Sequence, residues 1–110
     1  MYYLIIHLKS EAHITEVLMA LTENDATSTQ IIQSRSAANL IAFDIPVFAG
    51  FREMFGTKSE QSQIICSFIN HKEDVDNFLE SLKLANIDFI NDDIGEMFLL
   101  SLEAAFRKEE

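Results

Sequence analysis

The chain has few basic residues, a single cysteine and no long apolar run. Eight Lys and Arg residues face eighteen Asp and Glu residues, which gives a formal net charge of −10. Nucleic acids and anionic membrane surfaces both need clustered basic side chains, so this balance argues against either partner. We attribute the negative charge to solubility.

The single cysteine, Cys66, cannot form a disulfide within the chain. The apolar residues on either side of it predict a small buried hydrophobe, with a reactive thiol as the alternative. No apolar run exceeds a few residues, so no membrane insertion is expected. Residues 1–6 lack the basic start and the cleavage site of a secretory signal, and we therefore expect a cytoplasmic protein.

Catalytic and metal-binding motifs are also missing. The sequence contains no G-x-S-x-G, no P-loop and no Cys-His nucleophile pattern. Its three histidines, His7, His13 and His71, lack compact metal-ligand spacing. We interpret His7 as a packed residue, with a functional role at a subunit cleft as the alternative. We therefore predict no catalytic residue, no metal and no cofactor.

The densest carboxylate group lies beside the last predicted strand, at Asp92, Asp93 and Glu96. Three carboxylates so close together could hold a divalent cation weakly. The usual role of such a group is a solvated loop, which is our interpretation here.

Two halves of the chain look like copies of each other. A shift of 61 residues places the apolar run 3–8 on residues 64–69. The same shift aligns two sets of apolar residues at helical spacing. The first set is Ile14, Val17, Leu18 and Leu21, and the second is Val75, Phe78, Leu79 and Leu82. Each half therefore predicts a strand followed by a helix.

The predicted helices have candidate caps and are each followed by another strand. Ser10 is a candidate N-cap for the first helix and Asn70 for the second, with Glu73 three residues further on. The helices should end near Asn24 and Asn86. Residues 27–33 and 96–102 then form the second and fourth predicted strands.

The resulting fold class is α+β, a ferredoxin-like βαββαβ sandwich with a short helical insert between strands 2 and 3. With 110 residues and a hydrophobic fraction of 48%, the whole chain, 1–110, should form one domain with a packed core. The insert spans about 37–61. The first and third strands should be central, with both helices on one face of the sheet. Neither central strand has a polar side, so we expect other subunits to cover the open face.

The insert is unusually apolar for a connection. Residues 43–56 hold the chain's only proline, two of its three glycines and four of its nine phenylalanines. Asp44 can cap a helix, Pro46 fits its first turn and Gly56 can end it. We predict a helix whose phenylalanines pack on the sheet or on a neighbouring subunit. The alternative is a mobile loop that contacts a partner protein through Phe48, Phe51 and Phe55.

Residues 44–49 read Asp44-Ile45-Pro46-Val47-Phe48-Ala49. This segment resembles a motif that replaces the long T-loop in a divergent branch of small proteins related to the nitrogen-regulatory P-II superfamily. Residues 96–107 are similar to the last strand of that family and to the acidic and basic residues after it. The resemblance implies a compact trimer, ligand clefts between subunits and a regulatory protein partner.

The resemblance assigns ligand-cleft positions to Arg35, Gly95, Glu96 and Arg107. Several positions depart from the family pattern. The family's G-D-G-K element falls on residues 93–96, where Glu96 stands in place of the lysine. The second basic residue of its R-x-R falls on Glu109, and its G-x-G-R turn keeps no glycine. Because both charge reversals oppose phosphate, we expect no ordinary ATP or ADP binding.

Two functions of different classes follow. The first is a non-catalytic P-II-like regulatory or signalling protein that acts by binding a partner or a small ligand as a trimer. The second is a small ferredoxin-like oligomeric enzyme, of the cofactor-independent monooxygenase or isomerase type, with a cavity near His7. The second function predicts a dimer.

Overall fold

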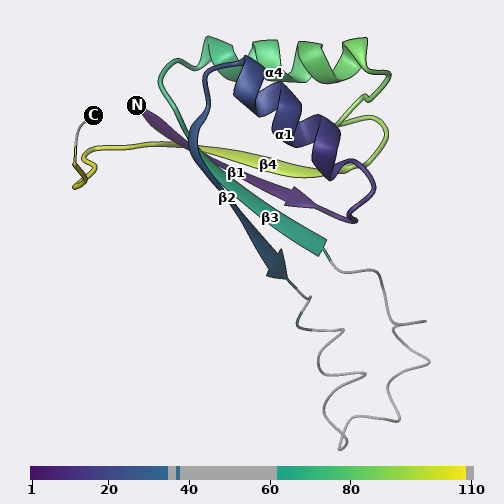
Figure 1. Cartoon of the computed structure of the whole chain (residues 1–110), viewed down its shortest axis with the longest axis horizontal. Helices are drawn as coiled ribbons and strands as arrows, with labels where there is room; N and C mark the ends of the chain where they lie inside the picture. Colours follow the sequence, from purple (N-terminus) through teal and green to yellow (C-terminus); the bar gives the residue numbers. More distant parts are fainter. Residues whose placement is uncertain (35–36, 38–61, 109–110) are drawn as a thin grey trace, which may run out of the picture.

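The computed structural model describes residues 1–34, 37 and 62–108 (Figure 1). In chain order the elements are β1 (Tyr2–Leu8), α1 (Ile14–Glu23), β2 (Thr27–Ser34), β3 (Ser62–Ile69), α4 (Glu73–Leu84) and β4 (Gly95–Ser101). This βαββαβ order confirms the predicted fold class. Apart from Ala37, the predicted insert lies outside the described residues. So do its predicted helix, the partner-contact candidates Phe48, Phe51 and Phe55, and the cleft candidate Arg35.

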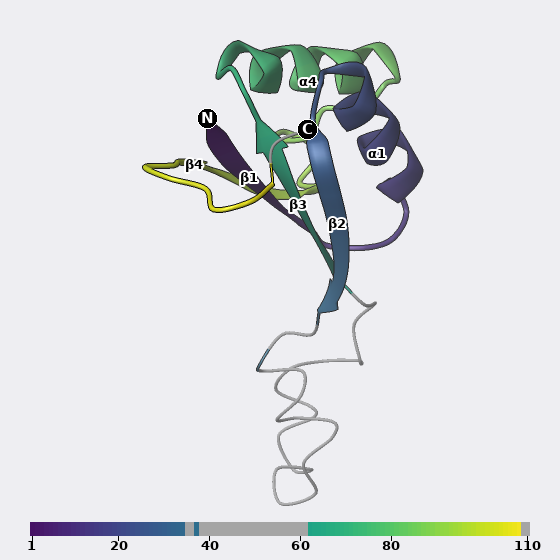
Figure 2. The ribbon, with the colours of Figure 1, turned by 60° about the vertical axis from the view of Figure 1, so that its left-hand side comes forward.

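The four strands form one antiparallel sheet in the order β2-β3-β1-β4. As predicted, β1 and β3 are central. In the register, Ile6 of β1 lies between Ile65 of β3 and Met97 of β4. Both helices cover the same face of the sheet, as Figures 1 and 2 show from two directions. Within the described residues, no helix is long and apolar enough to span a membrane.

The hydrophobic core lies between the helices and the sheet. Alternate residues of the central strands point into it and meet the apolar stripes of both helices. The core residues with almost no exposed surface include Leu4, Ile6 and Leu8 of β1, Ile65 and Ile69 of β3, Val17 and Leu21 of α1, and Phe78 and Leu82 of α4. Ile87 and Phe89, between α4 and β4, complete this core.

Both helices end as the repeat requires. The C-caps are Asn24 and Ala85, and the residues that follow, Asp25 and Asn86, have left-handed φ angles of 63° and 64°. The next N–H in each half donates back to the helix, from Ala26 to Leu21 O and from Ile87 to Leu82 O. Because Asp and Asn tolerate this conformation better than most residues, the two copies share one terminator.

The predicted N-caps are wrong. The residues at the N-cap positions are His13 and Lys72, and neither makes a side-chain capping hydrogen bond. A turn precedes each helix, so each helix begins three or four residues after the predicted cap. In the first half the Ser10 hydroxyl accepts a hydrogen bond from the Ala12 N–H at 3.3 Å inside this turn. In the second half Asp74 N donates to His71 O at 3.0 Å.

Candidate functional site

The face of the sheet opposite the helices, here called the open face, is largely apolar. Its side chains include Tyr3, Ile5 and His7 of β1, Ile64, Cys66 and Phe68 of β3, and Glu96, Phe98 and Leu100 of β4. Phe98 remains 50% exposed and Leu100 48% exposed. The structure thus confirms that neither side of the central strands is polar. Contiguous apolar surface of this kind marks an interaction site in soluble proteins.

Tyr3, Cys66 and Phe68 lie close together on the open face. The Tyr3 ring meets Phe68 edge-on, with the ring centroids 5.1 Å apart. Burial raises the pKa of the Tyr3 phenol, and its hydrogen bond with Cys66 raises that pKa further. Cys66 is only 8% exposed, which confirms the prediction of a buried small residue. This corner of the open face is therefore closely packed.

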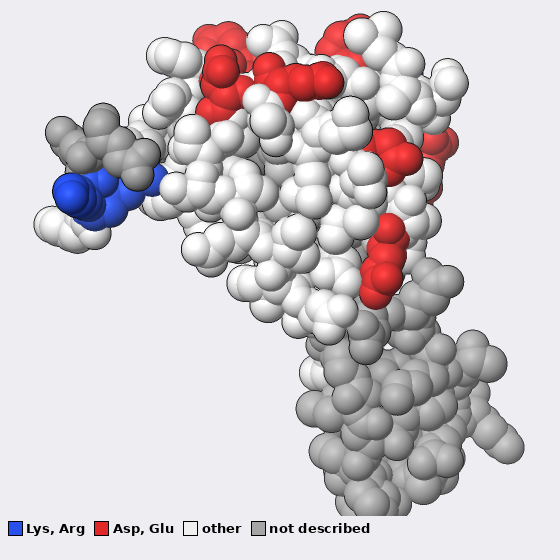
Figure 3. All heavy atoms as spheres, viewed as in Figure 1, with Lys and Arg blue, Asp and Glu red and all other residues white. Residues whose placement is uncertain are grey.

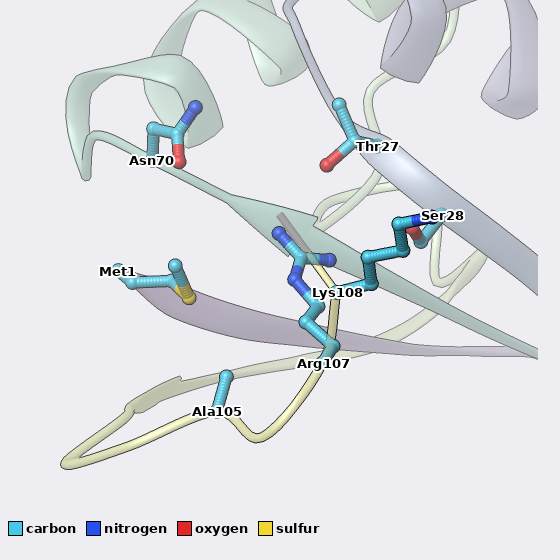
Figure 4. A pocket seen from close by; sticks show the side chains of 7 residues that line it. All are labelled: Met1, Thr27, Ser28, Asn70, Ala105, Arg107 and Lys108. Carbon is cyan, nitrogen blue, oxygen red and sulfur yellow. The ribbon is translucent and has the colours of Figure 1, made fainter. Parts of the chain in front are cut away.

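A pocket of about 600 Å³, here called the tail pocket, opens at the end of the sheet that holds the chain's N-terminus. Its walls come from the start of β2, the end of β3 and the C-terminal tail, residues 102–108 (Figure 4). The lining residues are Met1, Thr27, Ser28, Asn70, Ala105, Arg107 and Lys108. Five of these seven residues, from different segments of the chain, have side chains able to donate hydrogen bonds: Thr27, Ser28, Asn70, Arg107 and Lys108.

A β-bulge shapes the wall that β2 contributes. The pairing of β2 with β3 shifts between Thr27 and Gln30, and Ser28 has a left-handed φ of 52°. Ser67, a fully buried residue of β3, holds both sides of the bulge. Its hydroxyl donates to Thr27 O at 3.0 Å and shares a 2.8 Å hydrogen bond with the Thr29 hydroxyl. Bulges of this kind redirect side chains next to functional sites.

The tail brings Arg107 back over the sheet. Leu102 N donates to Met1 O at 3.1 Å, which fixes the start of the tail beside β1. The Arg107 guanidinium carbon lies 4.0 Å from the centroid of the Phe68 ring, a cation–π contact. In Figure 4 the guanidinium points toward the space between Asn70 and Thr27, while Lys108 extends toward Ser28. Arg107 therefore belongs both to the tail pocket and to the rim of the open face.

The charge at this end of the molecule differs in sign from the net charge of the chain, which is −10. In the view of Figure 3, basic atoms gather at the C-terminal tail on the left, whereas acidic atoms lie over the helices and along the right-hand edge. Arg107 and Lys108 add two cations to a pocket that also offers the hydroxyls of Thr27 and Ser28. This set of donors suits a small oxyanion.

The predicted cleft residues do not all meet within one chain. Arg107 lies in the tail pocket, whereas Gly95 and Glu96 begin β4. Gly95 is opposite Leu8, and the tail pocket is beside Met1, so the length of β1 separates them. A strand of this length spans roughly 20 Å.

Gly95 has a structural role at its own end of β1. A Cβ atom at this position would lie 2.1 Å from His7 O and 3.1 Å from Leu8 Cα. Glu96 pairs with His7 across the strands, on the open face. Nearby Asp93 has a φ of 53° and forms a 2.7 Å ion pair with Lys9. Asp93 thus keeps the left-handed backbone that favours glycine at this position.

Two carboxylates close to Asp93 in the sequence accept hydrogen bonds from neighbouring residues of the chain. Asp92 accepts a hydrogen bond from the Asp88 N–H at 3.1 Å, while Asp88 accepts from the backbone and side chain of Asn91. Asp92 and Asp93 are exposed and lie in a loop, which agrees with the interpretation of this carboxylate group as solvated, whereas Glu96 lies in β4. Among the described residues, no group of three or more His, Cys, Asp or Glu side chains is arranged to hold a metal ion.

Sequence reasoning missed most of the tail pocket. Thr27 and Ser28 look like ordinary strand residues, and Asn70 looks like a helix cap. Periodicity does not reveal a bulge or the path of a tail. The available signal was the adjacent pair Arg107 and Lys108, two cations next to each other in a chain with only eight.

Comparisons with known proteins found similarity among solved structures alone. No known family model matches the chain. No curated protein matches it either. Among solved structures, the chain is similar to CPII, a nitrogen-regulatory PII-like protein from Thiomonas intermedia K12 in complex with ADP, AMP and bicarbonate. The TM-score is 0.49 and the identity 18%, over 89% of this chain and 81% of that one. At this identity the similarity concerns the fold alone.

Proposed function

We propose that the chain is a non-catalytic regulatory protein of the P-II-like type, which assembles through its open face and binds a small oxyanion in the tail pocket. The observation that carries this proposal is a cationic pocket at the rim of an apolar sheet face, with Arg107 shared between them. The regulatory role itself rests on the sequence resemblance. Binding without turnover is consistent with the residues of the pocket, which include donors but no nucleophile paired with a base.

The open face supports assembly with other copies of the chain. Burying its phenylalanine and leucine side chains removes apolar surface from water, at about 25 cal/mol per Å². The resemblance makes the expected assembly a trimer. Assembly also offers the only way to join the separated cleft residues, since Gly95 of one copy could approach Arg107 of another. A regulatory protein partner would then bind the finished oligomer.

The residues favour a small oxyanion over ATP or ADP. Arg107 presents a planar fork of donors that matches a carboxylate or a phosphate group. Glu96, in contrast, would repel further phosphates at the other end of a shared cleft. The overall charge of −10 also opposes highly charged anions, although salt screens this effect beyond about 8 Å at physiological ionic strength. Direct contacts in the pocket are screened much less.

Calorimetric titration with pyrophosphate, phosphate, ATP and ADP tests this proposal. We expect pyrophosphate to bind the wild-type protein, with an affinity at least about tenfold lower in Arg107→Gln, because charge-assisted hydrogen bonds contribute about 1.5–3 kcal/mol. Lys9→Gln is the matched control, since it makes the same change in net charge at the other end of β1. No pyrophosphate binding to the wild type, or an equal loss in both variants, would contradict the proposal.

One observation favours the alternative of a small oligomeric enzyme. His7 is half-buried and lies directly across from Glu96, so the two could act as an acid–base pair on the open face. However, His7 does not line the tail pocket. The alternative therefore needs a second cavity, formed with another copy around His7. A dimer in solution whose bound substrate analogue is lost in His7→Gln would favour it.

A further inference from the structure

We infer that Phe68 is a positioning residue for anion binding: its ring holds the Arg107 guanidinium in the tail pocket and makes ligand affinity depend on a side chain of the open face. This inference rests on the proposed function, because it concerns the same pocket. Phe68 itself does not line the pocket, and Arg107 does. The contact between them is the 4.0 Å distance from the guanidinium carbon to the ring centroid.

Arg107 needs such support because the tail gives it little. Residues 103–108 are exposed and belong to no helix or strand. The backbone hydrogen bond from Leu102 N to Met1 O lies five residues before Arg107. A long side chain on such a segment loses much rotamer freedom when it binds a ligand. A contact that already orders the side chain lowers this cost and raises affinity.

Phe68, in contrast, is well fixed. It lies near the end of β3, a central strand, and pairs with Tyr3 on one side and Thr27 on the other. The Tyr3 ring supports it edge-on, with the two ring planes 64° apart. Thr27 also lines the tail pocket. The strand register thus places the aromatic platform directly beside the pocket wall.

The geometry leaves the donors of Arg107 available. All five N–H groups of a guanidinium lie in its plane, so a group held over a ring keeps them at its edge. In Figure 4 this edge faces the space between Asn70 and Thr27. An oxyanion there would accept hydrogen bonds from Arg107 without displacing it from Phe68. The repeat partner of Phe68 is His7, so this platform belongs to the second half of the chain alone.

A double-mutant cycle measured by pyrophosphate titration tests the inference. We expect Phe68→Leu to weaken pyrophosphate binding by about two- to fivefold, the range of an exposed cation–π contact. Phe68→Trp should retain binding, because it keeps an aromatic face. In the Arg107→Gln background, Phe68→Leu should have no further effect. Phe106→Leu is the matched control, since it makes the same change at a ring that is 98% exposed and does not line the tail pocket.

Proton NMR gives a second readout that needs no ligand. The Phe68 ring should shift the Arg107 side-chain signals upfield in the wild type and in Phe106→Leu, and this shift should disappear in Phe68→Leu. The inference is overturned if the shift is absent in the wild type. It is also overturned if Phe68→Leu binds pyrophosphate as the wild type does, or still weakens binding in the Arg107→Gln background. In those cases the proposed function stands, whereas a wild type that binds no pyrophosphate removes both.

Discussion

At the scale of single residues, Gly95 lies where the neighbouring strand leaves no room for a side chain. The family resemblance assigned it to a ligand cleft. The structure gives it another role, because the atom that a Cβ would meet is the backbone oxygen of His7. Arg107 is the opposite case: it lines the tail pocket, and its contact with an aromatic ring was not foreseen.

Gly95→Ala should destabilise the fold. The added Cβ meets backbone rather than a flexible side chain, so β1 and β4 must move apart. We expect a loss of about 2 kcal/mol or more in the free energy of unfolding, measured by urea denaturation. Glu96→Ala, at the next and exposed position, should change stability by less than about 0.5 kcal/mol. Equal stability of Gly95→Ala and the wild type would refute the structural role.

Asp88 should contribute to stability in a pH-dependent manner. The side-chain amide of Asn91 lowers the pKa of the Asp88 carboxyl, and the Asn91 backbone N–H lowers it further. Because the folded state favours the carboxylate, this contribution is present above the ordinary carboxyl pKa and is lost as pH falls through the lowered value. Urea denaturation between about pH 5 and pH 2 should therefore show a weaker loss of stability in Asp88→Asn than in the wild type. The same slope in both proteins would count against this assignment.

At the scale of elements, the repeat explains what the sequence could predict. Helical spacing and apolar runs predict two strand–helix units, and both units are present. The prediction succeeds because the spacing of apolar residues follows from burial of one face of each helix. Local signals were less informative. Ser10 and Asn70 are residue types that often begin a helix, but here both lie before the helix, in the turn that leads into it. The bulge at Ser28 and the return of the tail depend on tertiary contacts, with Ser67 and Phe68, that no local pattern contains.

The shared helix terminator allows an engineering test. Asp25 and Asn86 occupy left-handed positions, where glycine avoids the Cβ penalty. Asp25→Gly should therefore raise the free energy of unfolding by about 0.5–1 kcal/mol, and Asp25→Ala should not. Thermal unfolding followed by circular dichroism measures the difference. A glycine variant no more stable than the alanine variant would contradict the Cβ penalty at this position. A wild type more stable than the glycine variant would mean that Asp25 stabilises the turn through its side chain.

At the scale of the whole molecule, two surfaces differ in character. The helices and loops carry most of the described carboxylates, as Figure 3 shows for one side, and they keep that surface in water. The open face is apolar and ends at a cationic pocket. A monomer would leave this face exposed to water. We therefore regard assembly through the open face as the central claim. The proposed cleft between copies depends on it.

Sedimentation equilibrium of the full chain tests this claim most directly. We expect a single species with the mass of three chains of 12.5 kDa each, and dissociation of this species in Phe98→Glu, which places a charge on the open face. Leu84→Glu is the control, because it makes the same kind of change at an exposed position of α4, on the other side of the sheet, and should leave the mass unchanged. A wild-type monomer, or a dimer that persists in Phe98→Glu, would contradict the account.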